Sequence, residues 1–243
     1  MSEVASRIYK PSDFSHGLVG EMLITLGKKG FSPEMAAEVA NAKSGKAEGI
    51  VGLFPAMPNI VPFTDWQNFY RKFFSLELDF SQVRIPEKQV GFDRLIVVAQ
   101  GLTLNQIYEV CDKHFKCWRY YDNLDVAIDW DKEERNSNNG HYAIWVRDRV
   151  EADEELKNLS ANQIKEKGLK TETLRERKLH GFKYWSETKE HMDRNNTTSC
   201  TGSRVAGGGV PFVFWSRHYS KVCVSYYYPG YSYSSLRSRE VVS

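Results

Sequence analysis

The sequence predicts an α+β fold, and three observations lead to this class. Capped amphipathic helices alternate with short strands between residues 93 and 189. The run 95–99 is continuously apolar and rich in β-branched residues, which is typical of a buried strand. After residue 200 the chain reads as alternating strands separated by Gly and Pro turns. Strands and helices in this order predict layers packed around a sheet.

The composition is that of a globular protein and excludes few partners. Its 33 basic and 31 acidic residues nearly cancel, so the net charge of +2 gives no general attraction to nucleic acid or to an anionic membrane. The chain has no apolar run long enough to span a bilayer, and residues 1–17 lack the apolar core of a secretory signal. We therefore expect a cytoplasmic protein.

Three regions are predicted. Residues 1–48 form a helical N-terminal segment, with one helix over about 14–28 and a second that begins at Ser32-Pro33-Glu34, a favourable cap and first turn. Two short helices could bind DNA, but the second offers only Lys43 and Lys46, which favours a helical cap or an oligomerisation element. Residues 49–62 read as a Pro-rich linker, and 63–243 as the α+β domain.

The middle of the domain gives clear local signals. We expect a helix over 66–76, a strand over 79–86, the buried strand 95–99, a helix over 104–115 capped by Thr103, a strand over 117–121, a short helix over 124–130 and a strand over 141–148. Acidic residues 151–155 suit the solvated first turn of a helix. Ser160 caps a short helix, and Thr171 or Thr173 begins a longer one through about Lys189. The basic residues of that helix alternate with acids, so a solvated face is predicted for Arg175, Arg177, Lys178 and Lys183.

The four cysteines, Cys111, Cys117, Cys200 and Cys223, fit no zinc-site spacing. In a reducing compartment they are expected to be free and mostly buried. If the protein is exported, Cys200 and Cys223 are the pair to test for a disulfide.

The C-terminal stretch carries the most distinctive composition. Six of the 13 tyrosines follow Trp215, and they are mixed with serines and basic residues, as in an antibody paratope. A solvent-facing sheet that happens to be Tyr-rich is the alternative, because Tyr favours strands. Alternation predicts that Trp215, Val222, Val224 and Leu236 face the core, and that 236–242 is a closing strand.

A fixed frame surrounds these tyrosines: Gly202-Ser203-Arg204, Val210-Pro211, Trp215, Val222-x-Val224 and Leu236-Arg237-x-Arg239. In this respect the chain resembles the variable proteins of diversity-generating retroelements, over roughly 93–243. The resemblance implies a C-type-lectin fold, related to formylglycine-generating enzymes, in which altered surface residues bind ligands, commonly proteins. It implies as ligand-facing sites Phe212, Phe214, Ser216, Arg217, His218, Tyr219, Lys221, Cys223, Tyr226, Tyr228, Tyr231 and Tyr233.

Three functions remain open at this level. The first is a non-catalytic ligand-binding protein without a cofactor; calcium is not expected, since Glu240 is the one acid after Cys200. The second is a cysteine-dependent enzyme that uses Cys200 with Cys223, or His218 as base for Cys223. The third is a nucleic-acid binder that combines stacking tyrosines with Arg217, Lys221, Arg237 and Arg239.

Overall fold

The structure is a computed structural model that describes residues 22–24, 26–41, 60–138 and 140–243. The chain divides into two compact units, 1–59 and 60–243. In the first unit, α2 (Pro33–Ala40) begins as predicted, with the Ser32 hydroxyl accepting a hydrogen bond from the Met35 N–H at 3.3 Å. The start of the predicted helix over 14–28 and most of the predicted linker lie outside the described residues. The last three linker residues, 60–62, belong to the first helix of the second unit.

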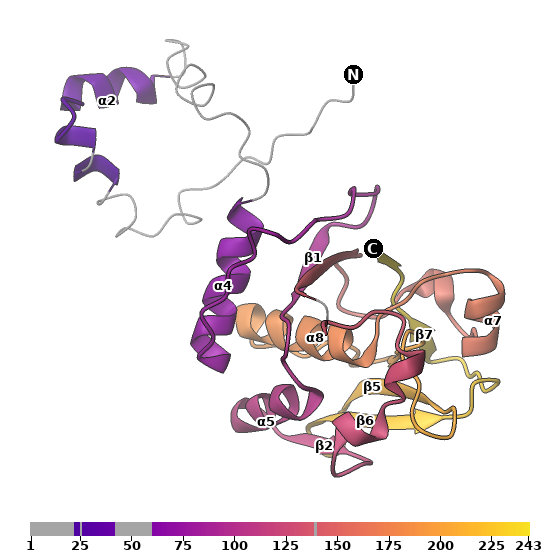
Figure 1. The fold of residues 1–243 in the computed structure, drawn as a ribbon. Helices are drawn as coiled ribbons and strands as arrows, with labels where there is room; N and C mark the ends of the chain where they lie inside the picture. The colour runs from indigo at the N-terminus through magenta and orange to yellow at the C-terminus, as the bar shows by residue number, and fades with distance from the viewer. Residues whose placement is uncertain (1–21, 25, 42–59, 139) are drawn as a thin grey trace. The chain divides into compact units, whose positions relative to one another are not determined.

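The second unit confirms the α+β class, with two separate sheets (Figure 1). The small sheet is antiparallel and has the order β1-β3-β8. The large sheet has the order β2-β6-β5-β4-β7, with β2 parallel to β6 and β4 parallel to β7. The strands are β1 (Arg94–Val98), β2 (Cys117–Arg119), β3 (Tyr142–Val146), β4 (Thr197–Ser199), β5 (Val210–Ser216), β6 (Lys221–Tyr227), β7 (Leu236–Ser238) and β8 (Val241–Val242).

Local capping signals decide where the helices begin. Thr103, Ser160 and Thr173 each form a capping box with the Gln or Glu three residues later, so two backbone N–H groups are satisfied at each start. These three predicted starts are confirmed. The helices of this unit are α4 (Ile60–Phe74), α5 (Leu104–His114), α6 (Leu124–Ala127), α7 (Ala161–Glu166) and α8 (Leu174–Thr188), with 3₁₀ turns η2 (Trp130–Lys132) and η3 (Glu154–Leu156).

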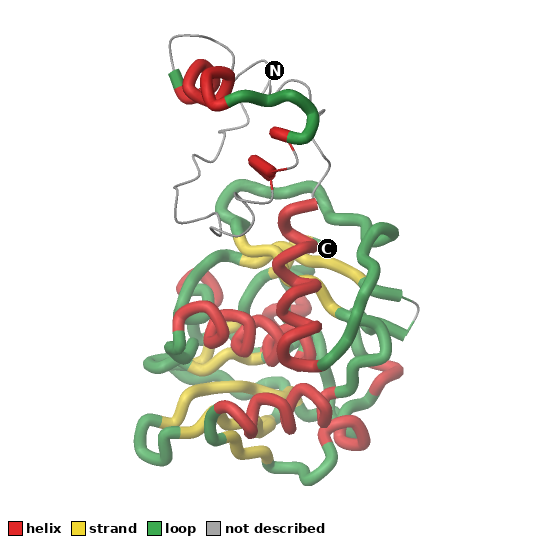
Figure 2. Tube along the Cα trace, turned by 90° about the vertical axis from the view of Figure 1, so that its left-hand side faces the viewer, coloured by secondary structure: helices red, strands yellow, loops and turns green. Residues whose placement is uncertain are grey.

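Helix α8 lies between the two sheets, and the turned view of Figure 2 shows the same separation. Its Leu179 and Phe182 join the core built on β1, while Leu174 joins a second core with Val213 and Val224 of the large sheet. Because α8 contacts both sheets, it fixes the large sheet against the rest of the unit.

The predicted solvated face of α8 is wrong. Arg175, Arg177, Lys178 and Lys183 are each less than 7% exposed. Lys183 pairs with Glu187 of the same helix, but most of the partners come from distant parts of the chain, which helix periodicity does not reveal. Buried Asp193, for example, accepts hydrogen bonds from Arg177 at 2.6 Å and from Arg239 at 2.7 Å.

The predicted solvated first turn holds for only part of the acidic run 151–155. Glu154 and Glu155 are exposed in the first turn of the 3₁₀ helix η3, but the acids before them are not. Asp153 is buried and pairs with Arg147 at 2.7 Å. The Glu151 carboxylate accepts hydrogen bonds from the backbone N–H groups of residues 194–196. Glu151 therefore ties the segment before η3 to the segment before β4.

Two predicted strands differ from the structure. Residues 79–86 have an alternating pattern but form no strand; the indole N–H of Trp145 donates to the Pro86 carbonyl at 3.0 Å instead. The predicted closing strand is broken into β7 of the large sheet and β8 of the small sheet. The break falls at Arg239, whose buried guanidinium bonds to Asp193 and to the carbonyls of Arg149 and Val150.

All four cysteines are free and buried, as expected for a reducing compartment. Among the described residues, no helix combines the length and apolarity that crossing a bilayer requires.

Candidate functional site

The large sheet has one packed face. The opposite face is uncovered over β2, β6 and the end of β5, but it is covered over β4 and β7, where Thr197, Ser199, Leu236 and Ser238 are buried. The register pairs Val213 with Val224 and Trp215 with Val222, so these side chains share the inner face toward α8. Val224 is buried in this inner core, as predicted. Leu236 is also buried, but it packs with Val210, Tyr227 and Ala161 on the opposite face. Trp215 and Val222 are partly buried, and both lie on the face that the alternation predicted.

The opposite face is called the open face here, and the register orders it in rows. Phe214 pairs with Cys223, which pairs with Trp118 of β2; Phe212 pairs with Ser225. Ser216 pairs with Lys221, and Lys116 precedes β2 beside them, accepting a hydrogen bond from the Val222 N–H at 3.0 Å. The open face thus consists of Lys116, Trp118, Phe212, Phe214, Ser216, Lys221, Cys223 and Ser225.

Aromatic rings follow one another along this face and past its end. Phe214 stacks on Phe212 with ring centroids 5.8 Å apart, and Phe212 contacts Tyr227 at 5.7 Å. Tyr231 continues the row at 6.4 Å from Tyr227, and Tyr233 lies 5.7 Å from Tyr231. Phe212 and Phe214 are partly exposed, and Tyr231 is 58% exposed. Such rings offer large contact area with few rotatable bonds.

The turn between β5 and β6 carries three of the residues that the resemblance implies. Arg217 donates to the Arg194 carbonyl at 3.1 Å and to Asn195 Oδ1 at 2.6 Å. His218 packs edge-on against Tyr219, with ring centroids 4.5 Å apart, and Tyr219 is 64% exposed. The turn is therefore anchored by Arg217 and presents His218 and Tyr219 to solvent.

Two of the implied ligand-facing residues are not placed at the surface of the open face. Cys223 points to that face but is only 5% exposed, between the Phe214 and Trp118 strands. Tyr226 lies two residues after Val224 on β6 and therefore faces the same, inner side of the sheet. Its ring centroid is 4.9 Å from that of Tyr120 and 5.4 Å from that of Tyr121. Tyr228, in contrast, is 81% exposed just after β6.

The sequence reasoning missed Trp118 and Lys116, which come from a strand about one hundred residues earlier. Trp118 is 43% exposed and completes the open face at its edge. Residues 117–121 were predicted to form a strand, but nothing in the sequence identified β6 as the partner of β2. Only the parallel register brings these residues beside Lys221 and Cys223.

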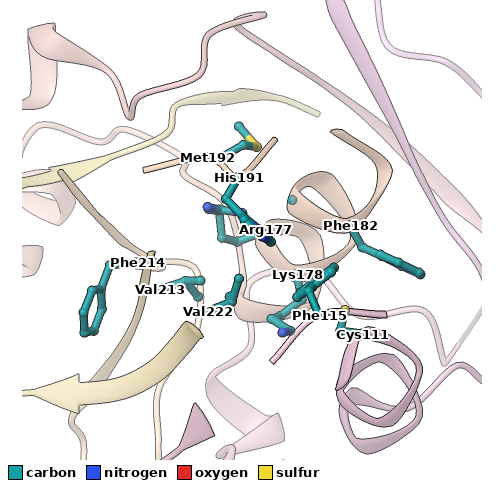
Figure 3. Close-up of a pocket in the computed structure, with 11 residues that line it drawn as sticks. Cys111, Phe115, Arg177, Lys178, Phe182, His191, Met192, Val213, Phe214 and Val222 are labelled. Atoms are coloured by element: carbon teal, nitrogen blue, oxygen red, sulfur yellow. The ribbon is translucent and has the colours of Figure 1, made fainter. Parts of the chain in front are cut away.

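The packing beneath the inner face leaves little free space (Figure 3). A cavity of about 20 Å³, lined among others by Cys111, Arg177 and Val222, has room for about one water molecule. Figure 3 also shows the Phe214 ring pointing away from this cavity. His191 stacks on Trp215 with centroids 3.9 Å apart, and burial lowers the pKa of His191 to about 4, so it is neutral at pH 7.

Several titratable groups have shifted pKa values, but they lie in the interior. Burial raises the pKa of Glu172 to about 8 and lowers that of His180, and the two side chains are 2.7 Å apart with no exposed surface. Burial also raises the pKa of the Cys223 thiol. Within the described residues, His218 packs against Tyr219, and no hydrogen bond or ring contact joins it to Cys223. In the same part of the chain, no group of three or more His, Cys, Asp or Glu side chains is arranged to hold a metal ion.

The structure also separates the four basic residues considered for nucleic-acid binding. Arg237 pairs with Glu154, and Arg239 is 1% exposed and pairs with Asp193. Only Arg217 and Lys221 remain near the open face without a carboxylate partner in the described part of the chain.

No family model, curated protein or solved structure matches this chain.

Proposed function

We propose that this chain is a non-catalytic ligand-binding protein, and that the open face, the β5–β6 turn and the exposed tyrosines after β6 form its binding surface. The observation that carries the proposal is the group of exposed or partly exposed rings, Trp118, Phe212 and Phe214, on one face of a sheet whose other face is packed. Rigid aromatic area of this kind is enriched where proteins bind one another. Cys223 is left out of this surface because it is buried, and Tyr226 because it lies on the inner face.

The proposal includes the resemblance to variable proteins of diversity-generating retroelements with a C-type-lectin-like fold. It is supported by the division of residues 202–239 into two sets. Val224, Leu236 and Arg237, which the resemblance makes part of the frame, are buried, whereas Tyr219, Tyr228 and Tyr231 are largely exposed. Exchange of the exposed set would leave the core unchanged, which a diversified binder requires.

Sequencing the 3′ end of the gene across a population of source cells tests this proposal. We expect substitutions at surface positions such as Phe212, Phe214, Tyr219 and Tyr231, together with a near-identical template copy and a reverse-transcriptase gene nearby. Val213, Val224, Asp193 and Arg239 should stay constant because they hold the fold. A uniform 3′ end without a template copy would remove the retroelement link.

A further inference from the structure

The charge on the binding surface is concentrated at one end. No acidic residue occurs between Asp193 and Glu240. Within that stretch Arg194 pairs with Glu190, Arg237 with Glu154 and Arg239 with Asp193, so three of its cations are neutralised. Arg217 binds only neutral acceptors, and Lys221 has no ion pair among the described residues.

The register adds a second lysine at the same end. Lys116 lies beside Lys221, which pairs with Ser216 on its other side. Lys116 is exposed and forms no ion pair within the described residues. The nearest acid along the chain, Asp112, instead accepts a hydrogen bond from the Cys117 N–H at 2.9 Å. Two lysines, together with Arg217 of the adjacent turn, therefore make a cationic end.

The rows beyond this end are aromatic and uncharged. Trp118 and Phe214 form the next row with Cys223, and Phe212 with Ser225 forms the one after it. The far end is closed, since Val210 and Tyr227 of this face pack with Ala161 of α7 and with Leu236. A ligand on this face would therefore contact positive charge at one end and aromatic rings in the middle, and α7 would limit its extent at the other end.

We infer that the partner of this surface is a polypeptide segment in which acidic residues precede or follow apolar or aromatic side chains. This inference rests on the proposed function and specifies the chemistry of the ligand. The acids meet Lys116 and Lys221, and the apolar side chains cover Trp118, Phe212 and Phe214. Opposite charges across an interface fix the orientation of the partner and speed association, while the apolar centre supplies most of the affinity.

A single-stranded nucleic acid is the other anionic ligand that stacks on rings, and the pattern favours it less. A bound strand carries a phosphate at every nucleotide and is followed by a basic groove. Here the rows around Trp118, Phe214 and Phe212 contain no basic residue. Arg237 and Arg239, toward the end of the chain, form ion pairs with Glu154 and Asp193.

The test is selection of a random displayed-peptide library on the purified chain, with synthetic copies of the enriched peptides used for affinity measurement. Three variants are compared: Lys116→Glu/Lys221→Glu, Phe212→Ala/Phe214→Ala, and the control Lys72→Glu/Lys165→Glu, which makes the same charge change at exposed lysines outside the open face. Thermal unfolding checks each fold. If the double Phe variant unfolds, Trp118→Ala replaces it, because that ring is 43% exposed.

We expect enriched peptides to combine acids with apolar residues, to lose at least tenfold in affinity on Lys116→Glu/Lys221→Glu and to keep it on the control. Peptides that need the rings but show no excess of acids would overturn the inference and leave the proposed function standing. A library that yields no peptide dependent on the rings would count against the proposed function itself. A single-stranded oligonucleotide that binds the chain more tightly than the peptides, with a steep salt dependence, would overturn the inference in favour of nucleic acid.

Discussion

Replacing Asp193 with Asn should be one of the most destabilising single changes in this protein. Asp193 is fully buried, and it accepts hydrogen bonds from Arg177, Arg239 and the Thr198 hydroxyl. Burial alone would raise the pKa of this carboxyl, yet the two guanidinium groups hold it below its ordinary value. The ionised carboxylate is thus the counter-charge for two arginines that are 3% and 1% exposed.

Asn keeps the size of the side chain and tolerates the left-handed backbone at this position, where φ is 54°. The change therefore removes the charge with little steric effect. Breaking a buried ion pair by removing one partner lowers the free energy of unfolding by about 3–5 kcal/mol. We expect a loss in that range in urea unfolding, which is a large part of the roughly 5–15 kcal/mol of a typical domain.

Two further variants keep this prediction open to refutation. Glu77→Gln removes an exposed partner of Arg71 and should leave the free energy of unfolding close to that of the parent. Thr198→Val removes the hydrogen bond that Thr198 donates to Asp193 and the one that it accepts from Arg239, while leaving both ion pairs. It should lower stability by about 1–2 kcal/mol. If Asp193→Asn is as mild as Glu77→Gln, the buried charges do not hold the sheets together in the way that we describe.

The remaining predictions concern pH, close packing and the tyrosines. Burial raises the pKa of Glu133 to about 8. The folded state therefore keeps a proton that the unfolded state releases near pH 4.5. Because of this difference, the free energy of unfolding falls as pH rises toward 8. Between pH 6 and pH 9 the free energy of unfolding should drop by about 2–3 kcal/mol more in the parent than in Glu133→Gln; equal slopes would contradict this. Gly202→Ala should destabilise by about 1–3 kcal/mol in denaturant unfolding, since the new Cβ would lie 2.8 Å from the Thr171 carbonyl oxygen; an unchanged midpoint would show that this contact relaxes freely. Tyr231→Ala should stay within about 1 kcal/mol, whereas Tyr226→Ala, on the inner face, should cost about 2–4 kcal/mol in the same assay; the reverse order would mean that the two faces are misassigned.

The sequence predicted what depends on neighbouring residues. The starts of α5, α7 and α8 follow from capping boxes within four residues, and β1 from its apolar run. The alternation in β5 and β6 separated Val213 and Val224 from Phe212 and Phe214, which defines the two faces of the sheet.

What the sequence did not predict depends on partners that are distant along the chain. The basic residues of α8 were predicted to face solvent because Asp193, the buried partner of Arg177 and of Arg239, lies outside the helix. Residues 79–86 alternate like a strand, but alternation cannot show whether a neighbouring strand is present. Trp118 joined the open face only through the parallel pairing of β2 with β6.

The division of the closing residues between two sheets has a consequence for biosynthesis. β7 is an edge strand of the large sheet, and β8 is an edge strand of the small one. Until the ribosome has made residues 236–242, β4 and β3 each expose an unpaired strand edge, which is a template for wrong pairing. The nascent chain therefore cannot complete either sheet before residues 236–242 are made. A chain that is terminated before Leu236 would have two unpaired strand edges, one on β4 and one on β3. Premature termination in this region should thus produce aggregates rather than a shortened native protein.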